Sequence, residues 1–492
     1  MSNLSDLLPA GAGAKSATFT ASGAIGNGVT VGLNSDGTVT AVGIFPESFG
    51  SPEVFESAAV SGASGDNMAA VYDSGNDRVV VFYRDQGNSN YGTAVVGTIS
   101  GTSISFGSPV VYESATVDYV RAAFDAGAGK TVTAYRDGGN SNYGTSVVGT
   151  VSGTSISFGA AVVFESANVH VYGVAFDSSA DKVVISYIDY GNNAYGTAIV
   201  GTVSGTSISF GSATVFAPVN LYSSQGGITY NAASDVVVMA YRDASVNSNR
   251  GAAIVGTVSG TSISFGSKTY FENGTISGSA GTIAITYDST NGKVVTACAD
   301  GGNSNQGTAA VGTVSGTSIS FGTPVVFETG AVVKLSAIYD ATNNKINIVY
   351  ADNGNSSKGT LVVGAVSGTT ISFEAPVIFN DGTTNGEISA TFDSAQSVVF
   401  IAYADGSNSS YGTGKVFQNE STNSADFIGI TDQAIADTAT GSVVVEGGVT
   451  EKVSGLTTGS TYYIQNDGSL STTSSSVTAG KALSATKLLL KG

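Results

Sequence analysis

Gly149–Gly159 reads GTVSGTSISFG, and the chain repeats these eleven letters without a change three more times. Two close variants begin at Gly97 and Gly364. The Ser-Gly pair in the middle suits a tight turn between antiparallel strands, because glycine adopts a positive φ without steric cost. The stretch therefore predicts a β-hairpin that recurs along the chain. The other unchanged copies are Gly201–Gly211, Gly256–Gly266 and Gly312–Gly322.

A second motif, Tyr-x-Asp followed by a turn rich in Gly, Asn and Ser, accompanies the hairpins. The glycine that opens the next strand recurs at intervals of 52 to 56 residues. Residues 119–166 divide into four short strands, and second strands such as residues 182–189, KVVISYID, are apolar on both faces. Such repeated four-stranded units are typical of β-propeller blades. The motif ends in Asp85, Asp137, Asp189, Asp243, Asp300, Asp352 and Asp405.

The two ends of the repeat region complement each other. Phe49–Ala58 nearly repeats Phe106–Ala115 but has no Tyr-x-Asp before it, and no fourth strand follows Tyr411–Phe417. Each end thus supplies part of one blade, and their pairing removes a free sheet edge. We predict an all-β fold: a seven-bladed β-propeller closed by strands from both termini, plus a small C-terminal β module.

Four domains are expected along the chain. Residues 1–42 form an extended segment and a hairpin that serve as an anchor, and residues 43–418 form the propeller. Residues 419–426 are a linker, and residues 427–492 form the small β domain. Ser-Asp-Gly and Asn-Asp-Gly mark the turns of the hairpins outside the propeller.

The composition excludes several classes of partner. Only 11% of the residues are charged, and the net charge is −18, so the surface repels nucleic acid and anionic membranes. No run approaches the ~20 apolar residues that span a bilayer, and the opening letters lack a secretory signal. With Cys298 and His170 as the single residues of their types, a disulfide framework and a Cys/His metal cluster are excluded.

A binding site is expected where the repeats differ, in the segments that cross from each fourth strand to the next blade. These segments share a face with the Tyr-x-Asp turns and carry aromatic and basic side chains, which suit sugars or carboxylates. The alternative is that these side chains fill the central channel. The candidate ligand-binding or receptor-binding residues are Tyr119, Arg121, His170, Tyr172, Tyr222 and Lys334.

The seven motif aspartates allow two interpretations. A calcium ion wants about 6–8 oxygen ligands, whereas each turn offers one carboxylate. Capping of an Asx turn needs only one Asp or Asn side chain. We assign these aspartates a structural role in their turns, and we predict no metal site and no cofactor.

The sequence also argues against catalysis. Arg84, Arg136 and Arg242 occupy equivalent repeat positions, so we interpret them as structural. His170 has no marked partner for a catalytic triad. We predict no catalytic residue and a non-enzymatic protein; a glycan-degrading enzyme with paired carboxylates is the alternative that the letters leave open.

Three stretches resemble bacteriophage proteins. They are the opening MSNLSDLLPAGAGAK, the repeats themselves, and GLTTGSTYYIQNDGSLSTT (455–473) followed by AGKALSATKLLL (479–490). They are similar to tail and other virion surface proteins, particularly of marine phages that infect cyanobacteria. The resemblance implies a structural virion protein, made in the host cytoplasm, without catalysis, and it carries over no functional residue.

The expected function follows from this resemblance and from the divergent face. We expect a multi-copy or homo-oligomeric component that contacts other virion proteins of the tail or capsid. The absence of heptads disfavours a long fibre. A tail spike or appendage that attaches to a host glycan or protein receptor is therefore the main hypothesis. The alternatives are a capsid decoration protein and a glycan-binding propeller lectin.

Overall fold

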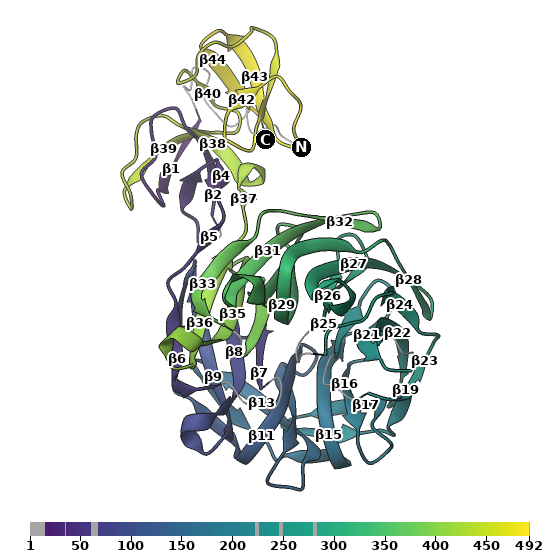
Figure 1. The fold of residues 1–492 in the computed structure, drawn as a ribbon. Coiled ribbons are helices and arrows are strands. Elements are labelled where there is room, and N and C mark those ends of the chain that lie inside the picture. The colour runs from purple at the N-terminus through teal and green to yellow at the C-terminus, as the bar shows by residue number, and fades with distance from the viewer. Residues whose placement is uncertain are drawn as a thin grey trace. The chain divides into compact units, whose positions relative to one another are not determined.

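A computed structural model describes residues 15–34, 36–60, 67–221, 226–245, 249–278, 283–384 and 386–491 (Figure 1). These residues form β-strands and loops in two compact units. The propeller unit is Ser48–Gln418, and the terminal unit combines Met1–Glu47 with Asn419–Gly492. Among the described residues, no helix is long and apolar enough to cross a membrane. The short 3-10 turns include η2 (Gln86–Asn88), η3 (Gly301–Asn303), η4 (Asn353–Asn355), η5 (Gly406–Asn408) and η6 (Ser424–Asp426).

The repeated eleven letters form the predicted hairpin. In the copy at Gly149–Gly159, β13 (Tyr143–Ser152) pairs antiparallel with β14 (Ser155–Phe158), and Ser152 lies opposite Ser155. Gly153 in the turn has a φ of 61°, in the left-handed region that favours glycine. The other half of β13 pairs with the start of β15 (Val162–Asp177), which continues into the next repeat.

The strands of the propeller unit repeat in one order, each pairing with the next. The first strands are β7 (Met68–Asp73), β11 (Val110–Asp125), β15, β20 (Gly226–Asn231), β25 (Ile283–Asp288), β29 (Val325–Asp340) and β34 (Ile388–Asp393). The second strands are β8 (Arg78–Asp85), β12 (Lys130–Asp137), β16 (Lys182–Asp189), β21 (Val236–Asp243), β26 (Lys293–Asp300), β30 (Lys345–Asp352) and β35 (Val398–Asp405). The third strands are β9 (Tyr91–Ser100), β13, β17 (Tyr195–Ser204), β22 (Arg250–Ser259), β27 (Gln306–Ser315), β31 (Lys358–Ser367) and β36 (Tyr411–Gln418).

Short strands form the outer side of this pattern. The hairpin partners of the third strands are β10 (Ser103–Phe106), β14, β18 (Ser207–Phe210), β23 (Ser262–Phe265), β28 (Ser318–Phe321) and β32 (Thr370–Phe373). Strands that follow them, or the starts of β11, β15 and β29, pair with the same third strands. The separate strands of this kind are β19 (Thr214–Asn220), β24 (Thr269–Glu272) and β33 (Val377–Thr383).

The propeller unit closes on itself. Each first strand contacts the next, and β34 contacts β7, where the Ala70 N–H donates to Ser389 Oγ at 2.9 Å. At the ends of the unit, β36 pairs with β5 (Ser48–Phe49) and β6 (Glu53–Ala59). The β-propeller fold and the pairing of its two ends are therefore confirmed. The count of seven blades stays a prediction from the sequence repeats.

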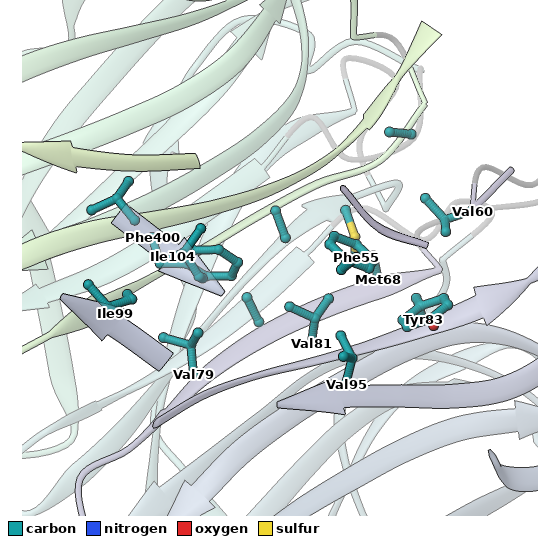
Figure 2. Close-up of a cluster of buried hydrophobic side chains, with 14 of the residues drawn as sticks. Phe55, Val60, Met68, Val79, Val81, Tyr83, Val95, Ile99, Ile104 and Phe400 are labelled. Carbon is teal, nitrogen blue, oxygen red and sulfur yellow. The ribbon is translucent and has the colours of Figure 1, made fainter. Parts of the chain in front are cut away.

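The hydrophobic core lies on both faces of the strands in the propeller unit. Val79, Val81 and Tyr83 of β8 point into one hydrophobic cluster, while Val80 and Phe82 point into another, as the twofold period of a strand requires. Figure 2 shows the first cluster, in which Phe55 from β6 and Phe400 from β35 lie with these β8 side chains. Residues from the two ends of the propeller unit thus share one core.

The described residues of the terminal unit form three small sheets. The first has the order β1 (Ser16–Thr20), β39 (Thr440–Val445), β38 (Phe427–Thr431), β2 (Thr30–Leu33) and β3 (Val39–Ala41). The second has the order β40 (Val449–Thr450), β44 (Lys487–Leu490), β43 (Thr478–Ser484), β41 (Thr461–Ile464) and β42 (Leu470–Ser471). A two-stranded sheet joins β37 (Ser421–Thr422) to β4 (Ile44–Phe45).

This arrangement differs from the domains expected from the sequence. Residues 1–42, 419–426 and 427–492 were expected as separate parts, but their described residues belong to one unit with shared sheets. The hairpin of β2 and β3 forms as expected and adds to the edge of β38. A lone two-stranded hairpin is marginally stable, which gives the physical reason for this pairing.

Candidate functional site

The motif aspartates are hydrogen-bonded within their own turns. Asp137 Oδ1 accepts from the backbone N–H groups of Gly139 at 2.9 Å and Asn140 at 3.1 Å. The other six accept from an N–H two or three residues ahead in the same way, the arrangement of an Asx turn. Within the described ranges, no group of three or more His, Cys, Asp or Glu side chains is placed to hold a metal ion.

Two predicted site residues lie at bulges of first strands. The pairing of β11 with β12 shifts register between Asp118 and Arg121, and that of β29 with β30 shifts between Val333 and Ser336. Tyr119 has a φ of 54° and Lys334 a φ of 56°. Such values are uncommon outside glycine, and a bulge re-aims the side chain that it carries. The two strands thus place an aromatic and a basic side chain at equivalent irregular positions.

Tyr119, His170 and Tyr190 form an aromatic stack. The Tyr119 and His170 rings lie 3.8 Å apart between centroids at an interplanar angle of 24°, and Tyr190 meets His170 edge-on at 4.8 Å. Tyr119 is buried, whereas Tyr190 is 36% exposed. Solvent therefore reaches the stack chiefly through Tyr190.

The imidazole of His170 is uncharged near neutral pH. Its burial, together with the positive charge of Arg136, lowers its pKa to about 3. His170 lies with Nε2 3.4 Å from Arg136 Nη1 and with Nδ1 3.3 Å from the Tyr190 hydroxyl. The ring is consequently a weak base that links the stack to the arginine.

A buried carboxylate joins arginines of two neighbouring repeats beside this stack. Asp118 Oδ1 accepts from Arg84 Nη1 at 2.6 Å, and Asp118 Oδ2 accepts from Arg136 Nη2 at 2.5 Å. The guanidinium carbon of Arg136 lies 4.8 Å from the centre of the Tyr119 ring. We name these residues together the Tyr119 cluster: Arg84, Asp118, Tyr119, Arg136, His170 and Tyr190.

Arg121, Tyr172 and Lys334 line a separate cavity of about 190 Å³ between the first strands. Arg121 Nε donates to the Tyr172 carbonyl at 3.1 Å, and Lys334 Nζ lies 3.9 Å from Glu387 Oε2. Burial raises the pKa of the Tyr172 phenol. The structure thus brings Tyr119 and His170 together and places Arg121, Tyr172 and Lys334 at this separate cavity. Tyr222 lies outside the described residues.

Sequence reasoning missed most of the Tyr119 cluster. The interpretation of Arg84 and Arg136 as repeated structural residues is incomplete, because they share the carboxylate of Asp118, a residue of one non-repeated segment. An acidic residue, Asp118, in a segment that differs between the repeats was the feature of the sequence that could have indicated this cluster. Tyr190 carried a weaker signal: it follows the motif aspartate, where the other repeats have small or polar residues.

Comparisons with known proteins bear on the fold. No protein-family model matches the sequence, and no curated protein matches it either. The BP39L lectin from Burkholderia pseudomallei has a similar structure, with a TM-score of 0.51 at 10% sequence identity, over 73% of this chain and 99% of that one. The β-propeller domain of Cps50 (Swd1) from Myceliophteria thermophila has a TM-score of 0.45 at 8% identity, over 72% of this chain and 98% of that one. The likeness to the BP39L lectin supports the fold and does not test the resemblance to virion proteins, which stays a prediction.

Proposed function

We propose that the propeller unit binds carbohydrate at the Tyr119 cluster. The observation that carries the proposal is an aromatic stack in direct contact with hydrogen-bonding charged groups. A sugar ring has an apolar C–H face, which packs on aromatic rings, and hydroxyl groups, which need donors and acceptors. Tyr190 is the exposed aromatic side chain, and Arg84, Asp118 and Arg136 are the charged groups nearby.

The fold supports the same proposal in a general way. A lectin with a TM-score of 0.51 to this chain is a propeller, so the architecture is compatible with carbohydrate binding. The residues around the stack suit binding better than catalysis. Asp118 is held by two arginines, and His170 is too weak a base at neutral pH to take a proton efficiently.

A glycan array followed by calorimetry on the full chain tests the proposal. Tyr190→Ala should weaken binding of any array hit by about tenfold or more, because it removes the exposed aromatic surface. Asn353→Ala is the matched control, since Asn353 occupies the same turn position in a repeat without the cluster. Binding that is unaffected by Tyr190→Ala, or no hit on the array, would count against the proposal.

We further propose, on the sequence resemblance alone, that the chain is displayed on a phage particle, where a bound glycan would belong to the host surface. Mass spectrometry of purified particles, followed by labelling of the chain on head or tail, tests this. Absence of the chain from the particles would remove this proposal and leave carbohydrate binding untouched.

A further inference from the structure

Within the six residues of the Tyr119 cluster, positively charged side chains outnumber negatively charged ones. Two guanidinium groups, those of Arg84 and Arg136, face the single described carboxylate of Asp118. His170 adds no negative charge and accepts at most one hydrogen bond from Arg136. Counted over these six side chains, the cluster has one more positive than negative charge, in a protein whose net charge is −18.

The same place has an excess of hydrogen-bond donors. Asn67 is fully buried, and its Oδ1 accepts from the Tyr119 N–H at 3.1 Å, while its Nδ2 finds no hydrogen-bond partner within the described chain. Arg136 Nε is likewise buried without an acceptor there. Buried donors are nearly always paired in folded proteins. Asn67 Nδ2 and Arg136 Nε, which belong to residues in contact with Tyr119, therefore indicate a place that can take a further acceptor.

From this imbalance we infer that the sugar bound at the Tyr119 cluster is acidic and that its carboxylate faces Arg84 and Arg136. The inference rests on the proposed function and specifies its ligand. A carboxylate offers two coplanar acceptor oxygens, which match the planar donors of a guanidinium group. It would also balance the excess charge, whereas a neutral sugar would supply only hydroxyl oxygens. The acidic surface elsewhere repels such a ligand, which would favour binding at this cluster alone.

Trigalacturonate and its methyl ester are the probes for this inference, because they differ in charge and share the ring. Calorimetry on the full wild-type chain should show binding of the acid, with about tenfold or greater loss for the ester. Equal binding of acid and ester, or preference for neutral oligosaccharides on an array, would overturn the acidic-sugar inference while the proposed function stands. Preference for sulfated oligosaccharides would overturn the assignment of a carboxylate. No binding to any sugar would overturn both.

Two arginine variants test whether the carboxylate of the sugar contacts Arg136. Arg136→Gln should weaken trigalacturonate binding about tenfold while the affinity for the ester changes little. Arg242→Gln is the matched control, since Arg242 occupies the same repeat position and the segment before its second strand, residues 214–225, contains no Asp or Glu in its sequence. Equal losses in both variants, or a loss for acid and ester alike in Arg136→Gln, would contradict a direct role. If Arg136→Gln does not fold, the comparison of trigalacturonate with its methyl ester on the wild-type chain still tests the inference.

Discussion

At the residue scale, the tyrosine of the Tyr-x-Asp motif donates to a glutamate of the outer strand in four repeats. The buried Tyr135 hydroxyl donates to Glu113 Oε2 at 3.0 Å. The same pair recurs in three other repeats: Tyr83 with Glu56, Tyr187 with Glu165 and Tyr350 with Glu328. In these four copies, the glutamate accepts a hydrogen bond from a tyrosine hydroxyl that is buried between the blades.

Removing one of these hydroxyls should have a moderate cost. Tyr135→Phe keeps the ring but removes one of the donors to Glu113, so we expect a loss of about 1 kcal/mol in the free energy of unfolding. Urea denaturation followed by circular dichroism measures it. Tyr403→Phe is the control, because Asn380 stands there in place of the glutamate; an equal loss in both variants would show that the glutamate is irrelevant.

The same glutamate should make stability depend on pH. Burial, and then the nearby Asp137, raise the pKa of Glu113 above its ordinary value. A raised folded-state pKa means that the contribution of Glu113 to stability is greatest below its ordinary pKa of 4.5 and is lost as pH rises through the folded-state pKa. Glu113→Gln, which does not titrate, should therefore gain stability relative to wild type between about pH 4 and pH 7. A difference that stays constant over this range would contradict the assignment.

At the element scale, the glycine that opens each third strand is explained by an aromatic side chain of the outer strand. A Cβ placed on Gly144 would lie 2.5 Å from the Phe164 ring, and Gly307 stands in the same relation to Phe327. The sequence shows the spacing of these glycines but not the contact with an aromatic ring that requires them. The contact joins residues about twenty positions apart, and their register depends on the β-bulges between the strands.

Gly144→Ala should destabilise the propeller unit by about 1–3 kcal/mol, because the aromatic ring has to move to admit a methyl group. Thermal and urea unfolding of the full chain measures this loss. In the double variant Gly144→Ala with Phe164→Leu, the two losses should be smaller than additive, since the smaller side chain makes room. Additive losses would mean that Gly144 matters for another reason.

The Asx turns give a prediction about metal. The motif aspartates already accept backbone N–H groups, so calcium has little to gain there. Addition of calcium or of a chelator should leave the unfolding temperature of the full chain unchanged. A rise of several degrees with calcium would revive the metal interpretation of these turns.

At the scale of the whole molecule, the sequence predicted the features that recur in every repeat and missed those that occur once. Strand order, hairpins and the pairing of the two ends follow from periodicity alone. The Tyr119 cluster depends instead on one bulge, at Tyr119, that brings Asp118 between arginines of two repeats. The sequence also did not show that the two ends of the chain share sheets in the terminal unit. Strands about 400 residues apart pair there, and such pairing produces no repeat in the sequence.

The pairing of the two ends should make the propeller unit behave as one cooperative body. Phe55 of β6 lies 5.3 Å from Tyr83 and 5.5 Å from Phe106 between ring centroids, and it also packs beside Gly412 of β36. Phe55→Ala should cost about 3–5 kcal/mol. Because Phe55 joins strands from both ends, hydrogen exchange should rise in β6 and β36 together and then spread to β7 and β35. Phe327→Ala removes the equivalent ring from an internal repeat and serves as the control, with exchange rising around β27 and β29. If Phe55→Ala left exchange in β36 unchanged, the two ends would not be coupled, and the ring would be held together by its first strands alone.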